Sequence, residues 1–357
     1  MKEKFVGFDI GTGNLVCARA LDISDKDKIK AEITMMRNMF IPVSKSDITL
    51  SELSNSTLKY IEVYETDGSL DKIAVIGEDA FKWANIFGGE VRRPMNKGVI
   101  SNKESDAYEI VAGMISDMIK SDDEDKYEKK YCVYSVPASP IDENIPSVKF
   151  HEAIFNQIFS KLGYTSMALN EGMAIIYSNC KKENYTGIGI SFGAGLTNIS
   201  ISYKGIPAIT FSIGRGGDWI DYKSAEATGK MVTRITSLKE NKLSLLPATI
   251  PNEKRDERRI KDVVRIFYTQ LMEYTLEKIC KKIEEYTDNI SIDMPVPIIL
   301  SGGTSMIEGF KEKFEEIFND KYINMFPFEI SEIRYANDQL TSVAQGCLEY
   351  NVLTFVK

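Results

Sequence analysis

The sequence predicts an α/β protein made of two related halves with a cleft between them. Strand-like apolar runs alternate with segments of helical periodicity along 357 residues, of which 43% are hydrophobic. A strand, a glycine-rich turn and another strand occur near residue 10 and again near residue 193, which indicates an internal duplication. The length predicts two or three packed units, at roughly 100–200 residues per domain.

Short runs of β-type residues predict the strands of the first half. They lie at residues 5–10, 15–21, 60–64, 73–76 and 131–136. The turn 11–14 between the first two is rich in glycine, and the polar stretch around the next two indicates a small inserted subdomain. Residues 105–119 have helical spacing. The charged run 120–130 is expected to be a solvated loop or a frayed helix end.

The second half repeats the strand, turn and strand pattern after a helix at 148–162 that Gly163 ends as a C-cap. Its strands are expected at 187–191, 197–203 and 295–300, a long amphipathic helix at 259–286, and a further helix from about Ile307. The first strand pair brackets Phe192-Gly-Ala-Gly195, and the last strand runs into Ser301-Gly-Gly-Thr-Ser305.

Composition excludes several classes of protein. With 44 basic and 52 acidic residues, the net charge of −8 argues against general nucleic-acid binding. No run of about 18 apolar residues could cross a membrane, and the amino terminus resembles a strand rather than a signal peptide. Five scattered cysteines without a Cys-x-x-Cys pair predict reduced thiols in the cytoplasm. A single histidine argues against a His-based zinc site.

Three glycine turns at strand ends carry the chemical signal. Backbone amides without side chains can approach phosphate oxygens closely, and Asp9 before the first turn would hold magnesium through water. The alternative is that each turn is only a hairpin. The chain has no P-loop, and its first turn lacks the third glycine of a dinucleotide site. The match of Gly189-Ile-Ser191-Phe-Gly193 to a hydrolase elbow lacks the following helix and a later histidine.

In this order the motifs resemble those of the actin/Hsp70/sugar-kinase superfamily. The phosphate-1, connecting, phosphate-2 and adenosine motifs would be Asp9-Ile-Gly-Thr-Gly13, Asn170-Glu171-Gly-Met-Ala174, Phe192-Gly-Ala-Gly195-Leu-Thr197 and Leu300-Ser-Gly-Gly303. Within it the chain is most similar to bacterial actins of the MreB and MamK kind. That likeness is carried by Arg93-Pro-Met-Asn-Lys-Gly-Val-Ile100, Gly216-Gly-Asp218-Trp-Ile-Asp221 and Leu340-Thr-Ser-Val-Ala-Gln-Gly346, and the resemblance as a whole covers residue 5 to about 350.

The resemblance implies an actin-like fold, with two lobes of duplicated ribonuclease-H-like βββαβα units around a nucleotide cleft. Lobe I would span residues 1–185 and include a small inserted subdomain at about 25–77. Lobe II would span 186–357 with a smaller subdomain at about 222–265, and the last helix would pack back on lobe I.

The resemblance also implies ATP or ADP and Mg²⁺ as cofactors. Asp9 would position the magnesium water shell and Glu171 would orient the attacking water, as the two catalytic carboxylates. The phosphates would contact Gly11, Thr12, Gly13, Asn14, Gly193, Ala194, Gly195 and Thr197. Gly217 and Asp218 would also bind the nucleotide. The adenosine would contact Gly302, Gly303 and Thr304. Lys239 and Glu240 would lie against ribose and adenine, or else be solvated helix charges.

Two departures from the family pattern modify this expectation. Ser191 stands where the family has an aspartate near magnesium, and Asn198 replaces a later acid, so metal binding at Ser191 should be weak and hydrolysis slow. The charged run 120–130 replaces the apolar loop with which MreB contacts membranes, so no membrane anchor is evident.

The leading hypothesis is therefore a cytoplasmic ATPase whose copies polymerise head-to-tail into filaments that act on an unknown cargo or adaptor. The alternative is a non-polymerising adaptor resembling PilM or FtsA, which binds nucleotide and hydrolyses it little. An Hsp70-type chaperone would need a second domain after residue 357, and a sugar kinase would need a substrate loop with a catalytic base.

Overall fold

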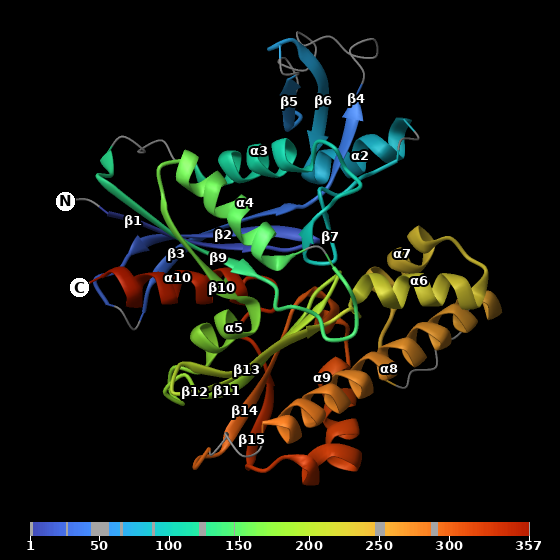
Figure 1. Ribbon diagram of the computed structural model, residues 1–357. Helices are drawn as coiled ribbons and strands as arrows, with labels where there is room; N and C mark the ends of the chain where they lie inside the picture. Colours follow the sequence, from blue (N-terminus) through green and yellow to red (C-terminus); the bar gives the residue numbers. More distant parts are fainter. Residues whose placement is uncertain are drawn as a thin grey trace. The chain divides into compact units, whose positions relative to one another are not determined.

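The computed structural model divides the chain into two compact units, which are coloured along the sequence in Figure 1. The first comprises Met1–Val136, Ile145–Leu169 and Cys347–Lys357, and the second comprises Pro137–Asn144 and Asn170–Gly346. The structure describes residues 3–25, 28–43, 57–64, 67–87, 90–120, 126–145, 147–246, 254–286 and 292–356.

The first unit is built on a five-stranded mixed sheet. Its strands are β1 (Glu3–Ile10), β2 (Asn14–Asp22), β3 (Lys30–Arg37), β9 (Lys129–Val136) and β10 (Thr165–Asn170), in the order β10-β9-β1-β2-β3. β2 is antiparallel to both β1 and β3, whereas β9 is parallel to β1. β9 starts at Lys129, because Lys129 and Lys130 pair with the first two residues of β1. The end of the charged run is therefore strand rather than loop, and its residues 121–125 lie outside the described residues.

The second unit repeats this sheet. Its strands are β11 (Gly187–Phe192), β12 (Thr197–Tyr203), β13 (Ile206–Ile213), β14 (Val296–Ser301) and β15 (Ile330–Tyr335), in the order β13-β12-β11-β14-β15. Again the first three strands form an antiparallel meander and the fourth lies parallel to the first. In both sheets the chain order is third, second, first, fourth, fifth, so the predicted duplication and α/β fold are confirmed.

Around the first sheet lie a small sheet, a short hairpin and three helices. The small sheet contains β4 (Phe40–Val43), β6 (Leu70–Ile76) and β5 (Tyr60–Tyr64), and the hairpin β7 (Met95–Asn96) and β8 (Val99–Ile100). The helices are α2 (Gly77–Phe87), α3 (Ala107–Ile119) and α4 (Val148–Lys161). In Figure 1, α3 and α4 lie on one side of the five-stranded sheet, where Phe8 and Tyr134 pack against Phe159 of α4.

Six α-helices accompany the sheet of the second unit within the described residues. They are α5 (Glu171–Asn179), α6 (Gly217–Thr228), α7 (Val232–Lys242), α8 (Arg255–Glu285), α9 (Phe310–Ile317) and the start of α10 (Ser342–Phe355). Shorter turns are the 3₁₀ segments η3 (Gly303–Met306) and η5 (Ile323–Met325) and the π segment η4 (Phe318–Tyr322). The helix expected from Ile307 begins at Phe310 instead, because η3 follows β14 directly and Gly309 has a φ of 81°.

The last helix crosses between the two parts of the chain, since α10 begins in the second unit and continues past Cys347 in the first. Asn351 of α10 is fully buried and donates hydrogen bonds from Nδ2 to the carbonyl oxygens of Val6 and Tyr131, at 2.9 and 3.0 Å. Phe355 stacks on the Tyr131 ring with centroids 4.5 Å apart. These contacts attach the end of α10 to β1 and β9.

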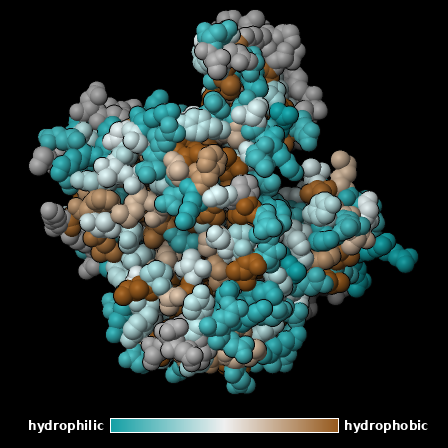
Figure 2. Space-filling model, in the orientation of Figure 1, coloured by the Kyte–Doolittle hydropathy of each residue, from teal (hydrophilic) through white to brown (hydrophobic). Residues whose placement is uncertain are grey.

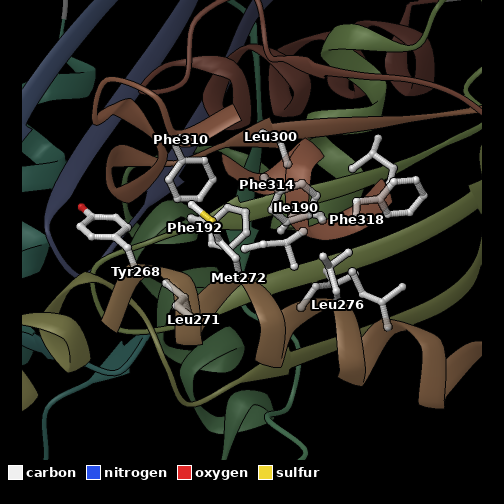
Figure 3. Packing of buried hydrophobic residues seen from close by; sticks show 14 of the residues in the cluster. Ile190, Phe192, Tyr268, Leu271, Met272, Leu276, Leu300, Phe310, Phe314 and Phe318 are labelled. Atoms are coloured by element: carbon white, nitrogen blue, oxygen red, sulfur yellow. The ribbon is translucent and has the colours of Figure 1, made fainter. Parts of the chain in front are cut away.

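The core of the second unit lies between its sheet and helices α8 and α9 (Figure 3). Phe192, the last residue of β11, meets Phe310 and Phe314 of α9 edge-to-face at 4.9 and 6.1 Å. The residue before the β11–β12 turn is thereby anchored in the core. On the face shown in Figure 2, hydrophilic residues are interspersed with smaller hydrophobic areas. Among the described residues, no helix is both long and apolar enough to span a membrane.

Candidate functional site

Three backbone turns of the second unit are joined by hydrogen bonds at one end of its sheet. The Gly193 carbonyl oxygen accepts from the Gly217 amide at 3.0 Å and from the Thr304 hydroxyl at 2.9 Å. The Ala194 carbonyl oxygen accepts from the Asp218 amide at 2.9 Å. The β11–β12 turn (residues 193–195), the start of α6 and the turn after β14 therefore form one group, which brings together five of the residues expected at a nucleotide.

Glycine is required where these turns approach one another. A Cβ on Gly216 would lie 2.5 Å from the Ala194 carbonyl oxygen, and one on Gly302, whose φ is 90°, would lie 2.4 Å from the Phe192 carbonyl oxygen. Both distances are to backbone, which cannot move aside as a flexible side chain could. The glycines therefore permit a close assembly of three backbone segments, which a simple hairpin turn would not need.

Lys239 of α7 joins the same group, whereas its neighbour Glu240 is exposed. Lys239 Nζ donates to the Gly217 carbonyl oxygen at 3.1 Å and to Asp221 Oδ2 at 2.9 Å. The two charged side chains are 10% and 3% exposed, so this is a buried ion pair. Burial raises the pKa of Asp221 while the Lys239 ammonium acts to lower it. The pair fixes the first turn of α6 against α7.

Asp9 and the β1–β2 turn (residues 11–13) form a second group, in the first unit. Asp9 Oδ1 accepts a hydrogen bond from Ser135 Oγ at 2.8 Å, and the same hydroxyl oxygen accepts from the Ile10 amide at 2.8 Å. Burial raises the pKa of Asp9 to about 6, and the Ser135 hydrogen bond counteracts that shift. Ser135 was not among the residues expected here. Its only sequence signal is its position at the end of the strand parallel to β1.

The β1–β2 turn is held from two sides by residues distant in sequence. The Asn38 side chain donates to the Gly11 carbonyl oxygen at 2.8 Å, and the Asn38 amide donates to the Gly13 carbonyl oxygen at 2.9 Å. Thr12 Oγ1 accepts from the Gly98 amide, in the β7–β8 hairpin, at 2.8 Å. Asn38, fully buried, was also not expected from the sequence. Asn14, which follows the turn, is the first residue of β2.

Glu171 is the first residue of α5 and is only 9% exposed. Asn170 caps the helix, because its Oδ1 accepts from the Gly172 amide at 2.9 Å and from Ser200 Oγ at 2.7 Å. A Cβ on Gly172 would lie 2.6 Å from the Ser200 amide nitrogen. The start of α5 is therefore fixed against β12, and Glu171 is a buried carboxyl group at a helix start rather than a surface charge.

Neutral polar residues occupy the strand positions around Ser191. Ser191 pairs with Asn198 on β12 and with Ser301 on β14, and Asn198 pairs in turn with Ser212 on β13. All four residues are buried. Thr197, beside Asn198, donates from Oγ1 to the Arg215 carbonyl oxygen at 2.8 Å. Over the described ranges, no three or more His, Cys, Asp or Glu side chains gather as a direct metal site.

Comparison with known proteins gives the family and the fold. Residues 5–350 match the Volactin family. No curated protein matches the chain. The fold is similar to that of a MamK double helical filament, with a TM-score of 0.68, 15% identity and 98% of each chain covered. A non-polymerising MamK mutant bound to AMPPNP gives a TM-score of 0.58 at 17% identity, with 98% of this chain and 99% of that chain covered. MreB5 of Spiroplasma citri bound to ADP gives 0.60 at 15% identity, with 99% of each chain covered. The chain therefore has an actin-like fold and belongs to the Volactin family.

Proposed function

We propose that the chain is an actin-like ATPase that binds ATP and ADP with Mg²⁺ and polymerises into filaments. The observation that carries the proposal is the hydrogen-bonded group that the β11–β12 turn, the start of α6 and the turn after β14 form in the second unit. Glycine turns at strand and helix ends suit phosphate groups, because no side chain blocks a close approach to the backbone. Two structural relatives with this fold are described as bound to AMPPNP and to ADP.

Different residues would contact the phosphates, the adenosine and the ribose of the nucleotide. The two strand turns, with Gly11, Thr12, Gly13 and Asn14 in one and Gly193, Ala194, Gly195 and Thr197 in the other, would contact the phosphates, with Gly217 and Asp218 at the start of α6. The turn Gly302, Gly303 and Thr304 would lie against adenosine. Lys239 would approach the ribose from its place beside Gly217, since its ammonium already lies 3.1 Å from the Gly217 carbonyl oxygen. Glu240 is exposed on α7 and is proposed only as a peripheral contact.

Magnesium would be held by Asp9. A pKa of about 6 leaves this carboxylate mostly ionised near neutral pH, and Ser135 fixes its orientation. Magnesium keeps several waters, so Asp9 would act through the water shell. A bound magnesium ion would supply neutralisation of phosphate charge. Ser191 offers a hydroxyl instead of a second carboxylate and would contribute weakly.

Hydrolysis would depend on Glu171, which would orient the attacking water. The fixed start of α5 holds the backbone that carries this carboxyl group, and positioning of groups is the main protein task in phosphoryl transfer. With a single carboxylate near the metal, turnover would be slow. Polymerisation would use a head-to-tail contact between copies, because such a contact does not close on itself. The five cysteines are buried free thiols, as suits action in the cytoplasm.

The test is light scattering of the purified protein after addition of Mg-ATP, with Mg-ADP as control. A rise that needs ATP and a critical concentration, followed by decay as phosphate appears, is expected of a dynamic filament. A rise without decay would mean that hydrolysis is lost. Absence of binding to either nucleotide in a parallel fluorescence titration would refute the proposal.

A non-polymerising adaptor that binds nucleotide is the second candidate. One observation favours it: Ser191 and its neighbours in the sheet, Asn198 and Ser301, are neutral rather than acidic. Nucleotide binding survives the absence of an acid at Ser191 more easily than hydrolysis does. Nucleotide binding without any rise in scattering would favour this candidate.

A further inference from the structure

The segment Pro137–Asn144 lies between β9 and α4 in the chain but belongs to the second unit. It runs parallel to the end of β13, where Pro140 pairs with Ser212. The Ser212 amide donates to the Ser139 carbonyl oxygen at 3.2 Å, and the Ile141 amide donates to the Ser212 carbonyl oxygen at 3.0 Å. We call this segment the strap.

Side chains of the second sheet extend the attachment of the strap. Asn198 Oδ1 accepts from the Ala138 amide at 2.9 Å, and Ser212 Oγ donates to the Ala138 carbonyl oxygen at 2.8 Å. Asn198 is one residue beyond Thr197 of the β11–β12 hairpin. Asn198 therefore has a structural use here, because its Oδ1 accepts a backbone N–H from the strap.

Asp142 of the strap connects the end of β13 to the long helix α8. Its Oδ1 accepts from the Gly214 amide at 2.8 Å, and its Oδ2 accepts from the Tyr274 hydroxyl at 2.9 Å. Burial, followed by this hydrogen bond, raises the pKa of Tyr274 to about 12, so the phenol remains a donor near neutral pH. Glu143 covers the same glycine, since a Cβ on Gly214 would lie 3.0 Å from the Glu143 Cβ.

Gly214 starts a short linker, residues 214–216, that joins β13 to α6. Two of its three residues are glycines, which have the widest backbone freedom. The third, Arg215, has its guanidinium 3.5 Å from the Tyr274 ring centroid and 4.8 Å from that of Trp219. The Arg215 carbonyl oxygen accepts from Thr197 Oγ1. The tethers from Asp142 and Tyr274 therefore add restraints to a linker in which two of three residues are glycines.

We propose that Asp142 is a positioning residue for the β11–β12 turn and the start of α6. Asp142 contacts Gly214 directly and acts on Arg215 through Tyr274. The linker is followed at once by Gly217, whose amide donates to the Gly193 carbonyl oxygen. This inference rests on the proposed function, because it assigns Asp142 a role in placing turns that would contact nucleotide. Asp142 acts through other residues and is not itself placed at the nucleotide.

Replacing Asp142 with alanine leaves a backbone N–H and a phenol without their acceptor and releases the linker. Asp142 is exposed, so water can replace the lost acceptor, and the loosened linker predicts Mg-ATP affinity about threefold to fivefold weaker. Asp142→Asn is the conservative variant, since its amide oxygen can still accept from Gly214. Tyr274→Phe removes one of the two bonds while keeping the ring beneath Arg215. Asp293→Ala is the matched control, because Asp293 also accepts a tyrosine hydroxyl, that of Tyr203 at 2.8 Å, elsewhere in this unit.

The experiment measures two quantities for the full chain. The first is amide hydrogen exchange over residues 214–218 without nucleotide, and the second is the Kd of a fluorescent ATP analogue with Mg²⁺. We expect Asp142→Ala to exchange faster at 214–218 and to bind more weakly. Asp142→Asn should lie near the wild type, Tyr274→Phe in between, and Asp293→Ala should match the wild type in both.

Unchanged exchange at 214–218 in Asp142→Ala, or exchange changed equally in Asp293→Ala, overturns the inference. Faster exchange with unchanged affinity also overturns it, since the linker would then be irrelevant to the site. If Asp142→Ala fails to fold, Tyr274→Phe and Asp142→Asn decide by the same two measurements. If the wild type binds no nucleotide, the proposed function fails, and exchange over 214–218 alone decides whether Asp142 holds the linker.

Discussion

Acidification should destabilise this protein through its single histidine, His151. The side chain is 1% exposed, on α4, and packs against Phe155 with ring centroids 4.6 Å apart. Its Nδ1 accepts from the Ile100 amide of the β7–β8 hairpin at 3.2 Å, and its Nε2 has no hydrogen-bond partner among the described residues. Burial lowers the pKa of His151 from 6.5 to about 3, so the imidazole stays neutral in the folded state.

The direction and the size of this change in the free energy of unfolding follow from proton linkage. As pH falls below the ordinary pKa of 6.5, the imidazole of the unfolded chain becomes protonated. In the folded chain the imidazole stays neutral until the pH nears 3. The contribution of His151 to the free energy of unfolding therefore decreases with falling pH. From about pH 7.5 to about pH 5 the loss from this residue is about 2 kcal/mol, and it approaches ~5 kcal/mol near pH 3.

The assay compares urea unfolding of the wild type and His151→Asn at the two higher pH values. Asparagine can still accept from the Ile100 amide but does not titrate, so the variant should lose about 2 kcal/mol less than the wild type over this interval. Since there is one histidine, its imidazole resonance can be followed directly by NMR. A native resonance that titrates near pH 6.5, or equal losses of stability in the two proteins, would refute the reasoning.

Three further predictions concern the proposed nucleotide site. Glu171→Gln should leave ATP binding intact and slow phosphate release by roughly a hundredfold; equal turnover would remove Glu171 from catalysis. Gly217→Ala should lower nucleotide affinity and thermal stability, by about 1–3 kcal/mol for the latter, because its Cβ would lie 2.7 Å from Thr304 Oγ1. Gly303→Ala is the comparison for stability, with its nearest contact at 3.5 Å. Ser191→Asp should sharpen the Mg²⁺ dependence of ATP binding, measured by metal titration.

The elements were predictable where their cause is local. Short apolar runs of β-type residues predicted the strands β1, β2, β11 and β12. Glycines lie in the turns between these strands, as expected. The order of the motifs also predicted the fold, because two repeats of one strand pattern imply two similar sheets. Helix and strand ends were less accurate where pairing decides them, as at Lys129, which is drawn into β9 by its partner Glu3.

The supporting residues of the site were not predictable, because distant pairing places them. Ser135 lies beside Asp9 only because β9 is parallel to β1, and Asn38 reaches the β1–β2 turn only after β3 has paired with β2. The resemblance to actins implied that Lys239 lies near the nucleotide, with a solvated helix charge as the alternative. Its buried partner Asp221, which determines where its ammonium lies, was visible only as part of a motif. Asp142 gave no signal, since a lone aspartate in a loop is usually solvated.

The position of Ser191 can be tested for a place near the magnesium ion of the proposed site. Its side chain is 4% exposed and lies between Asn198 and Ser301 in the sheet register. An aspartate placed there would be buried beside neutral partners, so without a cation its pKa would rise and the folded state would lose stability near neutral pH. A nearby metal ion with its bound waters would offset that cost. We therefore expect the melting temperature of Ser191→Asp to rise more with Mg-ATP than that of the wild type. An equal rise in both proteins would place this position outside the metal's surroundings and would leave slow hydrolysis in the wild type without an explanation at Ser191.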